Sequence, residues 1–475
     1  MFDRHSRAGR GAGDSELMHS AHKTGLRPAL WATSVFIVAA VGAMALISLV
    51  PARPWEDHFQ IALNFRNEGA LVVDGVHAIF RPPGFPVLFG SFLTAWDAAS
   101  TGLGARLDAT AALNRLPVFH SLLLGAMAVA IFAVSKRGVP LFAAALTSLA
   151  LTLNPLTLSI AIIATYHLTF LVAVTVVMAF VVVSPAGGLL TRRFGEGLAW
   201  GAVALVKPVA LAYPAYLLLL PGLGIWKRVR TVMAVALGVV TIIAPLIAYN
   251  WLRVGEPILT SQGGFALWGT SVEAIPDDDS FLNWQSIWFK HGMQIYAAVT
   301  GEDEYSQTTF NRESIPLNRA FGAAALRNIA EAPHIYLNNV LRNSVSFSVS
   351  SMQFWPALLP SRNKDKLLFN MVAAPFIYMF ISLSVLGGVI GLLMRSGDAI
   401  HGLLLLLAVI GAHAISFATE LYTIAKYPAL AVLFCVFVST MYAALLRRTH
   451  YRLLGVALPG AMLLWGVLAS AVMLR

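Results

Sequence analysis

Two acids and one arginine stand out in the stretch from residue 54 to residue 86, which lies between hydrophobic segments. Glu56 and Asp57 are adjacent carboxylates, and Arg81 opens the motif Arg-Pro-Pro-Gly-Phe-Pro. A carboxylate there can take a proton from an incoming hydroxyl or amine, as a general base does. The planar guanidinium of Arg81 suits a phosphate, and the prolines after it stiffen its backbone. This stretch is therefore predicted to be a catalytic face.

Ordinary structural roles fit the same residues. Two acids also suit the first turn of a solvated helix, where the helix dipole favours negative charge. Neighbouring side chains on a helix point about 100° apart, so only one of Glu56 and Asp57 can face a given substrate atom. Arg81 also fits a turn residue whose charged end reaches for lipid headgroups. The sequence leaves these alternatives open.

A second cation, Lys207, lies in the apolar run Ala-Leu-Val-Lys-Pro-Val-Ala-Leu. A lysine there is expected to face a polar cavity, with an anionic lipid phosphate as its partner, or to snorkel to the interface. A lone histidine such as His167 is more often an interior residue than a metal ligand, and no metal site is predicted. Five further residues are predicted to line the same cavity: His58, Tyr166, His167, Glu420 and Lys426.

The amino-acid composition indicates the class of protein that positions these residues. The chain has 475 residues, of which 58% are hydrophobic and 12% charged, which is too apolar for a soluble domain. The net charge of +10 comes mostly from short basic clusters between apolar runs. The positive-inside rule explains such clusters, so the lipid bilayer is a predicted partner and nucleic acid is not. The single cysteine, Cys435, excludes a disulfide framework and a cysteine-based metal site.

The sequence predicts an all-α polytopic membrane protein with about 11 transmembrane helices. Residues 1–27 are polar and basic, and are predicted to be a disordered cytoplasmic tail. The segment 198–223 is interpreted as a hairpin split at Lys207-Pro208, because this keeps the next basic cluster in the cytoplasm. The other spans are predicted near 28–50, 112–134, 139–155, 164–186, 231–250, 368–394, 400–418, 426–445 and 453–473.

Three larger parts follow from these spans. Residues 28–250 form an N-terminal transmembrane catalytic module, whose first external loop, 51–111, contains amphipathic helices. Residues 251–367 form a longer external region with surface helices, interrupted at Pro333. Residues 368–475 carry the last four spans.

The order of these motifs resembles the GT-C superfamily of membrane glycosyltransferases, in the branch of the protein O-mannosyltransferases and the lipid A aminoarabinose transferase (families 39 and 83). Residues 81–86 match the family's Arg-Pro-Pro-Gly-Tyr-Pro element closely. Residues 197–214 resemble its glycine-rich helix with a cation near the end, and residues 244–269 the segment that leads into its external region. The Glu420-to-Pro428 stretch resembles its Glu-x-Arg-Tyr element. His58 or Phe59 replaces the usual tyrosine after the aspartate, and 165–167 reads Thr-Tyr-His instead of Ser-Glu.

The resemblance implies a glycosyltransferase that uses a polyprenyl-phosphate sugar donor in a bacterial inner membrane, with its active site facing the periplasm. Asp57 would deprotonate the acceptor, with Glu56 as the competing base, and Arg81 and Lys207 would hold the donor phosphate. The acceptor would be a glycolipid, a polysaccharide or a protein. No cofactor is certain, and a divalent metal remains open.

Two other functional classes compete. A transporter or flippase of lipid-linked sugars would also need cations for a phosphate, but it should show paired inverted halves, and the sequence has no such symmetry. A structural subunit of an envelope assembly complex would not need the carboxylates and cations.

Overall fold

Helices make up nearly all of the computed structural model, which describes residues 11–49, 56–100, 106–163, 165–183, 190–221, 224–273, 287–349, 373–415, 424–446 and 454–473. Within these ranges the exception is one antiparallel β-hairpin, formed by β1 (Val72–Val73) and β2 (Val76–His77). The prediction of an all-α polytopic membrane protein is confirmed, with this small hairpin as an addition.

Seven described helices are long and apolar enough to cross a membrane. They are Arg27–Ile47 of α1 (Gly11–Ile47), α4 (Ala109–Ser135), α7 (Thr165–Val183), α9 (Ile225–Val254), α17 (Ala374–Leu393), α18 (Gly397–Ala414) and α19 (Tyr427–Leu446). The pair α5 (Leu141–Thr152) and α6 (Pro155–Ile163), which is bent by 46°, is apolar enough to make an eighth if its two helices count as one broken span. The bend follows from Pro155, which cannot continue the hydrogen-bond ladder of α5 but suits the first turn of a new helix.

The predicted count of about 11 spans exceeds the seven or eight that meet this criterion. The difference lies in three short elements: α8 (Leu190–Val206), the 3₁₀-helix η1 (Pro208–Leu219), and α20 (Leu454–Met473), whose apolar part is Val456–Ala471. Helix α1 begins at Gly11, within the segment 1–27 that the sequence analysis assigns to the cytoplasmic tail. A helix that is nucleated by a membrane span extends at one hydrogen bond per added residue, so no new nucleus is required.

The segment around Lys207 is a hairpin, as predicted. α8 ends at Val206, and η1 begins at Pro208. The hydroxyl of Tyr216 in η1 donates to Oε1 of Glu196 in α8 at 2.6 Å. Eleven residues of α-helix and nine of 3₁₀-helix both span about 17 Å, so the two arms run antiparallel and meet again at this bond. Lys207 therefore lies at the tip of the hairpin.

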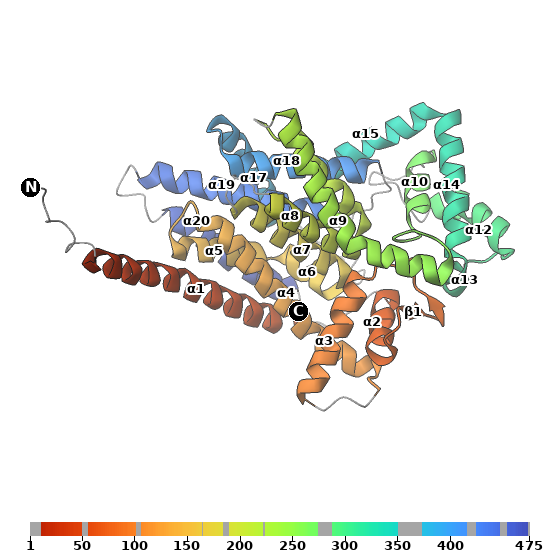
Figure 1. Ribbon diagram of the computed structural model, residues 1–475, viewed down its shortest axis with the longest axis horizontal. Helices are drawn as coiled ribbons and strands as arrows, with labels where there is room; N and C mark the ends of the chain where they lie inside the picture. The colour runs from red at the N-terminus through yellow and green to blue at the C-terminus, as the bar shows by residue number, and fades with distance from the viewer. Residues whose placement is uncertain are drawn as a thin grey trace, which may run out of the picture.

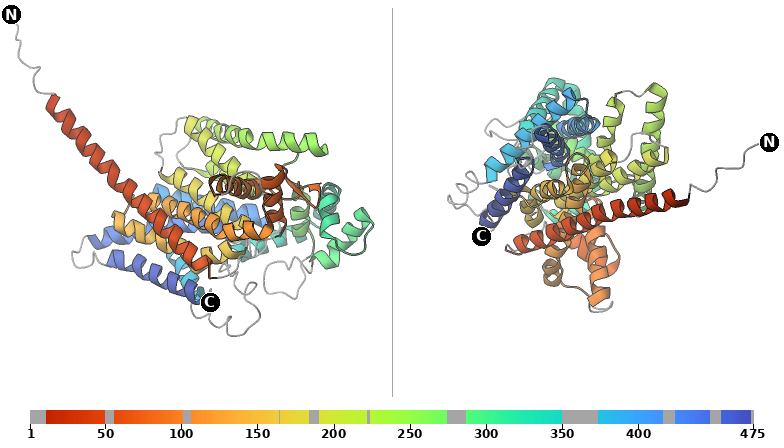
Figure 2. Two further views of the ribbon diagram at one scale, coloured as in Figure 1. Left: turned by 90° about the horizontal axis from the view of Figure 1, so that it is seen from below. Right: turned by 90° about the vertical axis from the view of Figure 1, so that its left-hand side faces the viewer.

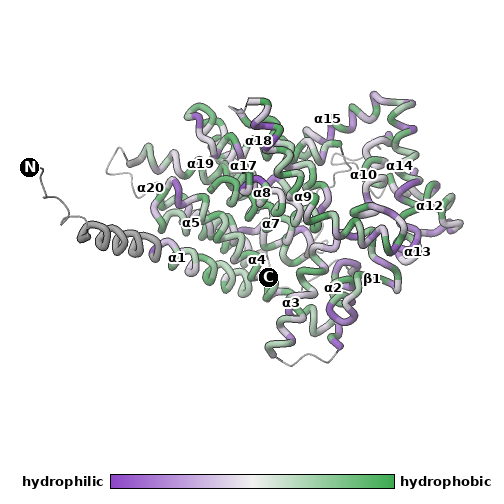
Figure 3. The backbone as a smooth tube through the Cα atoms, viewed as in Figure 1, coloured by the Kyte–Doolittle hydropathy of each residue, from purple (hydrophilic) through white to green (hydrophobic). Residues whose placement is uncertain are grey.

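In Figure 1, α1 and α19 lie near the horizontal and α9 runs more steeply, and Figure 2 shows α1 projecting beyond the others toward its N-terminal end. The backbone of α8 lies directly against that of α9, since a Cβ on Gly197 would meet the carbonyl oxygen of Val235 at 2.1 Å. Small residues permit such close helix contacts in membranes. Figure 3 shows apolar residues predominating along the spans, with polar residues more frequent at the opposite end from the N-terminus.

At that end lie the first-loop helices and the external region (Figure 1). The loop contributes α2 (Glu56–Glu68) and α3 (Gly84–Ser100). The external region contributes α10 (Gly263–Ser271), the π-helix η2 (Trp288–Gly292), α12 (Met293–Thr300), α13 (Gln307–Arg312), α14 (Ser314–Glu331) and α15 (Pro333–Val349). The predicted interruption at Pro333 is confirmed, because α14 ends before it and α15 begins with it.

The first loop and the external region share one core. Phe80 of the loop packs among buried aromatic residues of the external region, and its ring centroid lies 4.7 Å from that of Phe310. Next to it, the backbone N–H of Ser261 donates to the carbonyl of Ile79 at 3.1 Å. The site predicted in the loop is thus held from two sides.

Candidate active site

Asp57 and Arg81 form an ion pair. The Nη2 and Nε atoms of Arg81 both donate to Oδ2 of Asp57, at 2.7 and 3.2 Å. Their side chains are 18% and 17% exposed, so the pair is partly buried but within reach of a ligand. The sequence assigned these residues separate roles and did not predict that they bind each other.

Hydrophobic neighbours hold Arg81 in place. Its guanidinium carbon lies 4.7 Å from the ring centroid of Phe80, a cation–π distance. Pro82 and Pro83 after it are both buried. Because the residues on either side of Arg81 are anchored, its charged end is held in a fixed place.

The turn after Arg81 lies directly on the tip of the hairpin that carries Lys207. A Cβ on Gly84 would meet the backbone nitrogen of Val206 at 2.6 Å and the carbonyl of Leu205 at 2.7 Å. Only glycine permits this approach, which explains the glycine of the Arg-Pro-Pro-Gly motif. The two predicted phosphate-binding cations therefore come from segments in backbone contact.

His58, Tyr166 and His167 form a buried row beside the ion pair. The ring of His58 is 1% exposed and stacks on Tyr166 with centroids 4.5 Å apart, and the rings of Tyr166 and His167 are 3.9 Å apart. Burial, and then the charge of Arg81, lower the pKa of His58 well below its ordinary value. His58 is therefore neutral at neutral pH and adds no charge beside Arg81.

Lys207 extends this row inward, and three residues that the sequence did not single out continue it: Phe170, Tyr213 and His413. The Nζ atom of Lys207 lies 5.2 Å from the ring centroid of Phe170. Tyr213 lies 6.1 Å from Phe170 and 6.2 Å from His413, measured between ring centroids. A 3₁₀-helix has three residues per turn, so Lys207 at its N-cap and Tyr213 fall on one buried face. If the helix had been known to be a 3₁₀-helix, its repeat of three residues would have predicted Tyr213 on the same face as Lys207.

Lys426 has a structural role in addition to its predicted place in the cavity. Its Nζ donates to the carbonyl oxygens of Phe347 at 2.8 Å and Ser348 at 3.2 Å. These carbonyls belong to the last turn of α15, where a cation complements the helix dipole. Glu420 lies outside the described residues, as does the side chain of Glu56, whose backbone begins α2. No cluster of three or more potential metal ligands occurs in the described part of the chain.

Tyr305, which the sequence analysis missed, stands near the ion pair at the external end. Its ring is 42% exposed and lies 5.6 Å from Trp288 and 5.9 Å from Phe310. Burial of its hydroxyl raises the pKa to about 12; the charge of Arg81 lowers it and that of Asp57 raises it. The phenol is neutral at ordinary pH and donates to Oε1 of Gln307 at 2.5 Å.

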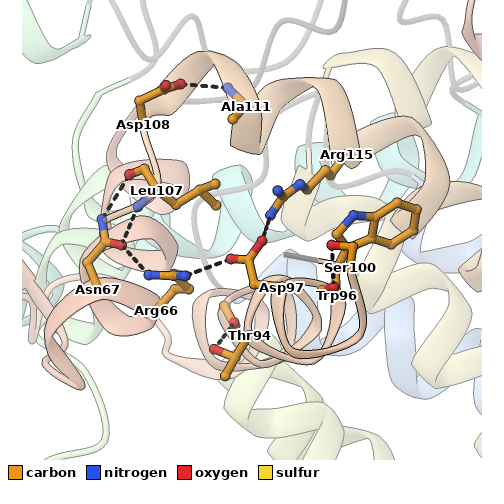
Figure 4. A network of polar contacts seen from close by, with 11 residues as sticks. Arg66, Asn67, Thr94, Trp96, Asp97, Ser100, Leu107, Asp108, Ala111 and Arg115 are labelled. Atoms are coloured by element: carbon orange, nitrogen blue, oxygen red, sulfur yellow. Dashed lines mark hydrogen bonds and ion pairs between the residues drawn. The ribbon is translucent and has the colours of Figure 1, made fainter. Parts of the chain in front are cut away.

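A second ion-pair network braces the helix that carries Asp57. Arg66 of α2 donates to Oδ2 of Asp97 in α3 at 2.7 and 3.0 Å, and Arg115 of α4 binds Oδ1 of the same carboxylate (Figure 4). The side chain of Asp97 is only 3% exposed, so two arginines compensate one buried charge. This network ties α2 to the bundle but lies apart from the proposed chemistry.

No model of a protein family matches this sequence, and no curated protein matches it. Solved structures that resemble this one include two membrane enzymes. The first is the oligosaccharyltransferase AglB from Archaeoglobus fulgidus, in complex with an inhibitory peptide and a dolichol-phosphate, at 11% identity and a TM-score of 0.49. The match covers 94% of this chain and 55% of that one, so this chain spans about half the length of AglB.

The second is ArnT from Cupriavidus metallidurans bound to undecaprenyl phosphate, at 16% identity and a TM-score of 0.40. That match covers 88% of this chain and 80% of ArnT. At these scores the two matches are a likeness only.

Proposed function

We propose that this protein is a membrane glycosyltransferase that moves a sugar from a polyprenyl-phosphate donor to an acceptor on the periplasmic side of a bacterial inner membrane. The observation that carries the proposal is the ion pair between Asp57 and Arg81, held on the hairpin tip that bears Lys207. A carboxylate lies beside a cation suited to phosphate, and the turn after that cation contacts the backbone of the segment that carries Lys207. The motif resemblance of residues 81–86 supports the same reaction.

The donor phosphate binds Arg81 and Lys207. Arg81 offers two parallel N–H donors, the geometry that matches a phosphate. As the bond between the anomeric carbon and the phosphate oxygen breaks, its electron pair stays on the phosphate. Fixed cations stabilise the charge that develops there. The sugar arrives already activated, so the reaction requires no nucleotide.

Binding of the phosphate also releases the base. In the empty site Asp57 occupies the donors of Arg81 that the phosphate needs. When the phosphate takes them, Asp57 loses its partner and its carboxylate can accept a proton. The acceptor oxygen or nitrogen attacks the anomeric carbon as its proton passes to Asp57, and one displacement inverts that carbon. The acceptor, a glycolipid, polysaccharide or protein, approaches past Tyr305 and the external helices.

The proposed replacement of Asp57 by the donor phosphate as the partner of Arg81 is tested by measuring the binding of undecaprenyl phosphate to the purified protein in detergent. Arg81→Ala and Lys207→Ala should each weaken binding by about 1.5 to 3 kcal/mol, the strength of a hydrogen bond to a charged group. Asp57→Asn should strengthen it by up to about fivefold, because an ion pair of this exposure contributes up to about 1 kcal/mol. Arg106→Ala is the matched control, since Arg106 is 76% exposed and pairs with Glu68. Unchanged affinity in the Arg81 variant would return that residue to a headgroup-facing role.

The reaction itself is tested in cells with and without the gene, by mass spectrometry of envelope glycolipids, polysaccharides and glycoproteins. Loss of one sugar from one class of acceptor identifies the product. If instead the lipid-linked sugar accumulates on the cytoplasmic leaflet while purified protein transfers nothing, the chain is a transporter.

A further inference from the structure

Helix α15 presents an exposed apolar stripe. Leu337, Leu341 and Val345 are 59%, 66% and 61% exposed and follow one another at intervals of four residues. Residues spaced in this way lie on one face of a helix, and these cover about 12 Å of its length. Three large aliphatic side chains so exposed in one row are expected to have a covering partner.

The opposite face of α15 is fixed to the protein. Asn339 donates to the carbonyl oxygens of Thr270 at 2.9 Å and Val272 at 2.7 Å, at the end of α10. The hydroxyl of Tyr336 donates to the carbonyl of Ile415, just beyond the end of α18, at 3.3 Å. The stripe therefore faces outward in a set orientation.

A membrane-facing surface leads up to the stripe. α18 is a candidate membrane span, and its own exposed row includes Leu407 at 57% and Ile415 at 53%, separated by eight residues. Because Tyr336 binds the carbonyl of Ile415, the stripe of α15 begins where the lipid-facing row of α18 ends. In Figure 1, α15 extends from the end of α18 at the margin of the molecule.

We propose that α15 lies in the boundary between headgroups and hydrocarbon of the outer leaflet, with Leu337, Leu341 and Val345 in the hydrocarbon. His334 lies on the same face one turn before Leu337, and Asn338 is exposed at the edge of the stripe, so polar side chains adjoin the apolar row at its beginning. A surface helix with an apolar outward face lies in the plane of the membrane surface, with that face toward the hydrocarbon. Tyr336 stands at the same level, where tyrosine is enriched in membrane proteins.

This contact fixes the height of the external region above the bilayer. α15 is bonded to α10 by Asn339, and Trp268 of α10 belongs to the aromatic core that holds Phe80. Arg81 follows Phe80 directly. The inference does not depend on glycosyl transfer, since it concerns only where the protein meets lipid.

Site-directed spin labelling tests the proposal on the full chain in vesicles of phosphatidylethanolamine and phosphatidylglycerol. Cys435 is buried and is first replaced by Cys435→Ala. A nitroxide is then attached at Leu341→Cys, or at Val345→Cys if the first variant folds poorly. Glu304→Cys, on the exposed segment after α12, is the matched control.

The label on α15 should collide more often with oxygen, which concentrates in hydrocarbon, than with a water-soluble nickel chelate, and the label at 304 should show the reverse. A label on α15 as accessible to nickel as the control overturns the proposal in favour of an aqueous face. A label shielded from both reagents also overturns it, in favour of a protein partner.

Discussion

Asp57 has the only carboxylate among the described side chains that is bonded to Arg81, and both bonds end on one of its oxygens. A general base acts by accepting a proton in the transition state, which an amide of the same shape cannot do. Asp57→Asn should therefore lower turnover by about 10² to 10⁴-fold without weakening donor binding. The measurement is single-turnover transfer at saturating donor.

Glu56→Gln is the companion variant. Glu56 precedes Asp57 on α2, and a step of about 100° separates their directions. We expect only a modest fall in turnover. The reverse ranking would make Glu56 the base, and full activity in both variants would remove this loop from catalysis.

His58 makes folding sensitive to acid. Its folded pKa is depressed by burial and by Arg81, so below about pH 6.5 the unfolded chain binds a proton that the folded protein resists. The contribution of neutral His58 to the free energy of unfolding is fully present above that pH, and it is lost as the pH falls below it. Nδ1 of His58 has no hydrogen-bond partner among the described residues. Replacing His58 with phenylalanine would therefore break no hydrogen bond at this atom.

His58→Phe keeps an aromatic ring against Tyr166 and cannot titrate. It should reduce the loss of thermal stability in detergent between about pH 7 and pH 5. Wild-type protein in the same detergent is the reference. An unchanged slope in the His58 variant would assign the acid sensitivity to other groups.

At the scale of elements, the contact between α3 and α8 joins the two cations. Gly84→Ala places a methyl group 2.6 to 2.7 Å from the backbone of Leu205 and Val206, which cannot move aside as a side chain would. We expect a loss of about 1 to 3 kcal/mol in stability and weaker binding of undecaprenyl phosphate, although no charge is removed. Gly195→Ala, on α8 with open space around it, should be neutral or slightly stabilising. Equal effects from both substitutions would refute the contact as the link.

The sequence predicted the hairpin because a single span over 198–223 would place the next basic cluster outside, and Pro208 offers a break in the helix. Proline alone would not have sufficed, since Pro117 and Pro245 lie inside the continuous helices α4 and α9.

The sequence did not predict the ion pair, since Asp57 and Arg81 lie 24 residues apart and meet only after β1 and β2 reverse the chain. The sequence did not predict the contact of Lys426 for a similar reason. Its acceptors are at the end of a helix 79 residues away, and where a helix ends cannot be read to one residue.

For the whole molecule, the hairpin determines the topology. The chain turns at Lys207 and returns along α8, so α9 must start on the side where α8 started. A reporter fused after residue 190 should indicate the cytoplasm, and one near residue 300 the periplasm. Paired fusions to alkaline phosphatase and to a fluorescent protein measure this. Signals from the same side would show that the two arms do not form a re-entrant pair.

Apolar runs and basic clusters predicted the spans because the bilayer imposes length and charge rules on each segment alone. The union of the first loop with the external region obeys no such rule. It depends on Phe80 fitting among rings such as Phe310, and complementarity between distant segments leaves no periodic trace in the sequence.

The packing of Phe80 in the external region also determines when, during synthesis of the chain, the candidate site can form. The ribosome adds roughly 5–20 residues per second, so the first loop waits on the order of 10 to 50 s before α10 to α14 emerge to receive that ring. Until then Arg81 lacks half of its support, and the loop is open to proteases. A nascent chain arrested before residue 260 should be cut there, and one arrested beyond residue 350 should resist. The newborn protein thus passes through a period in which its first membrane spans exist and its proposed active site is incomplete.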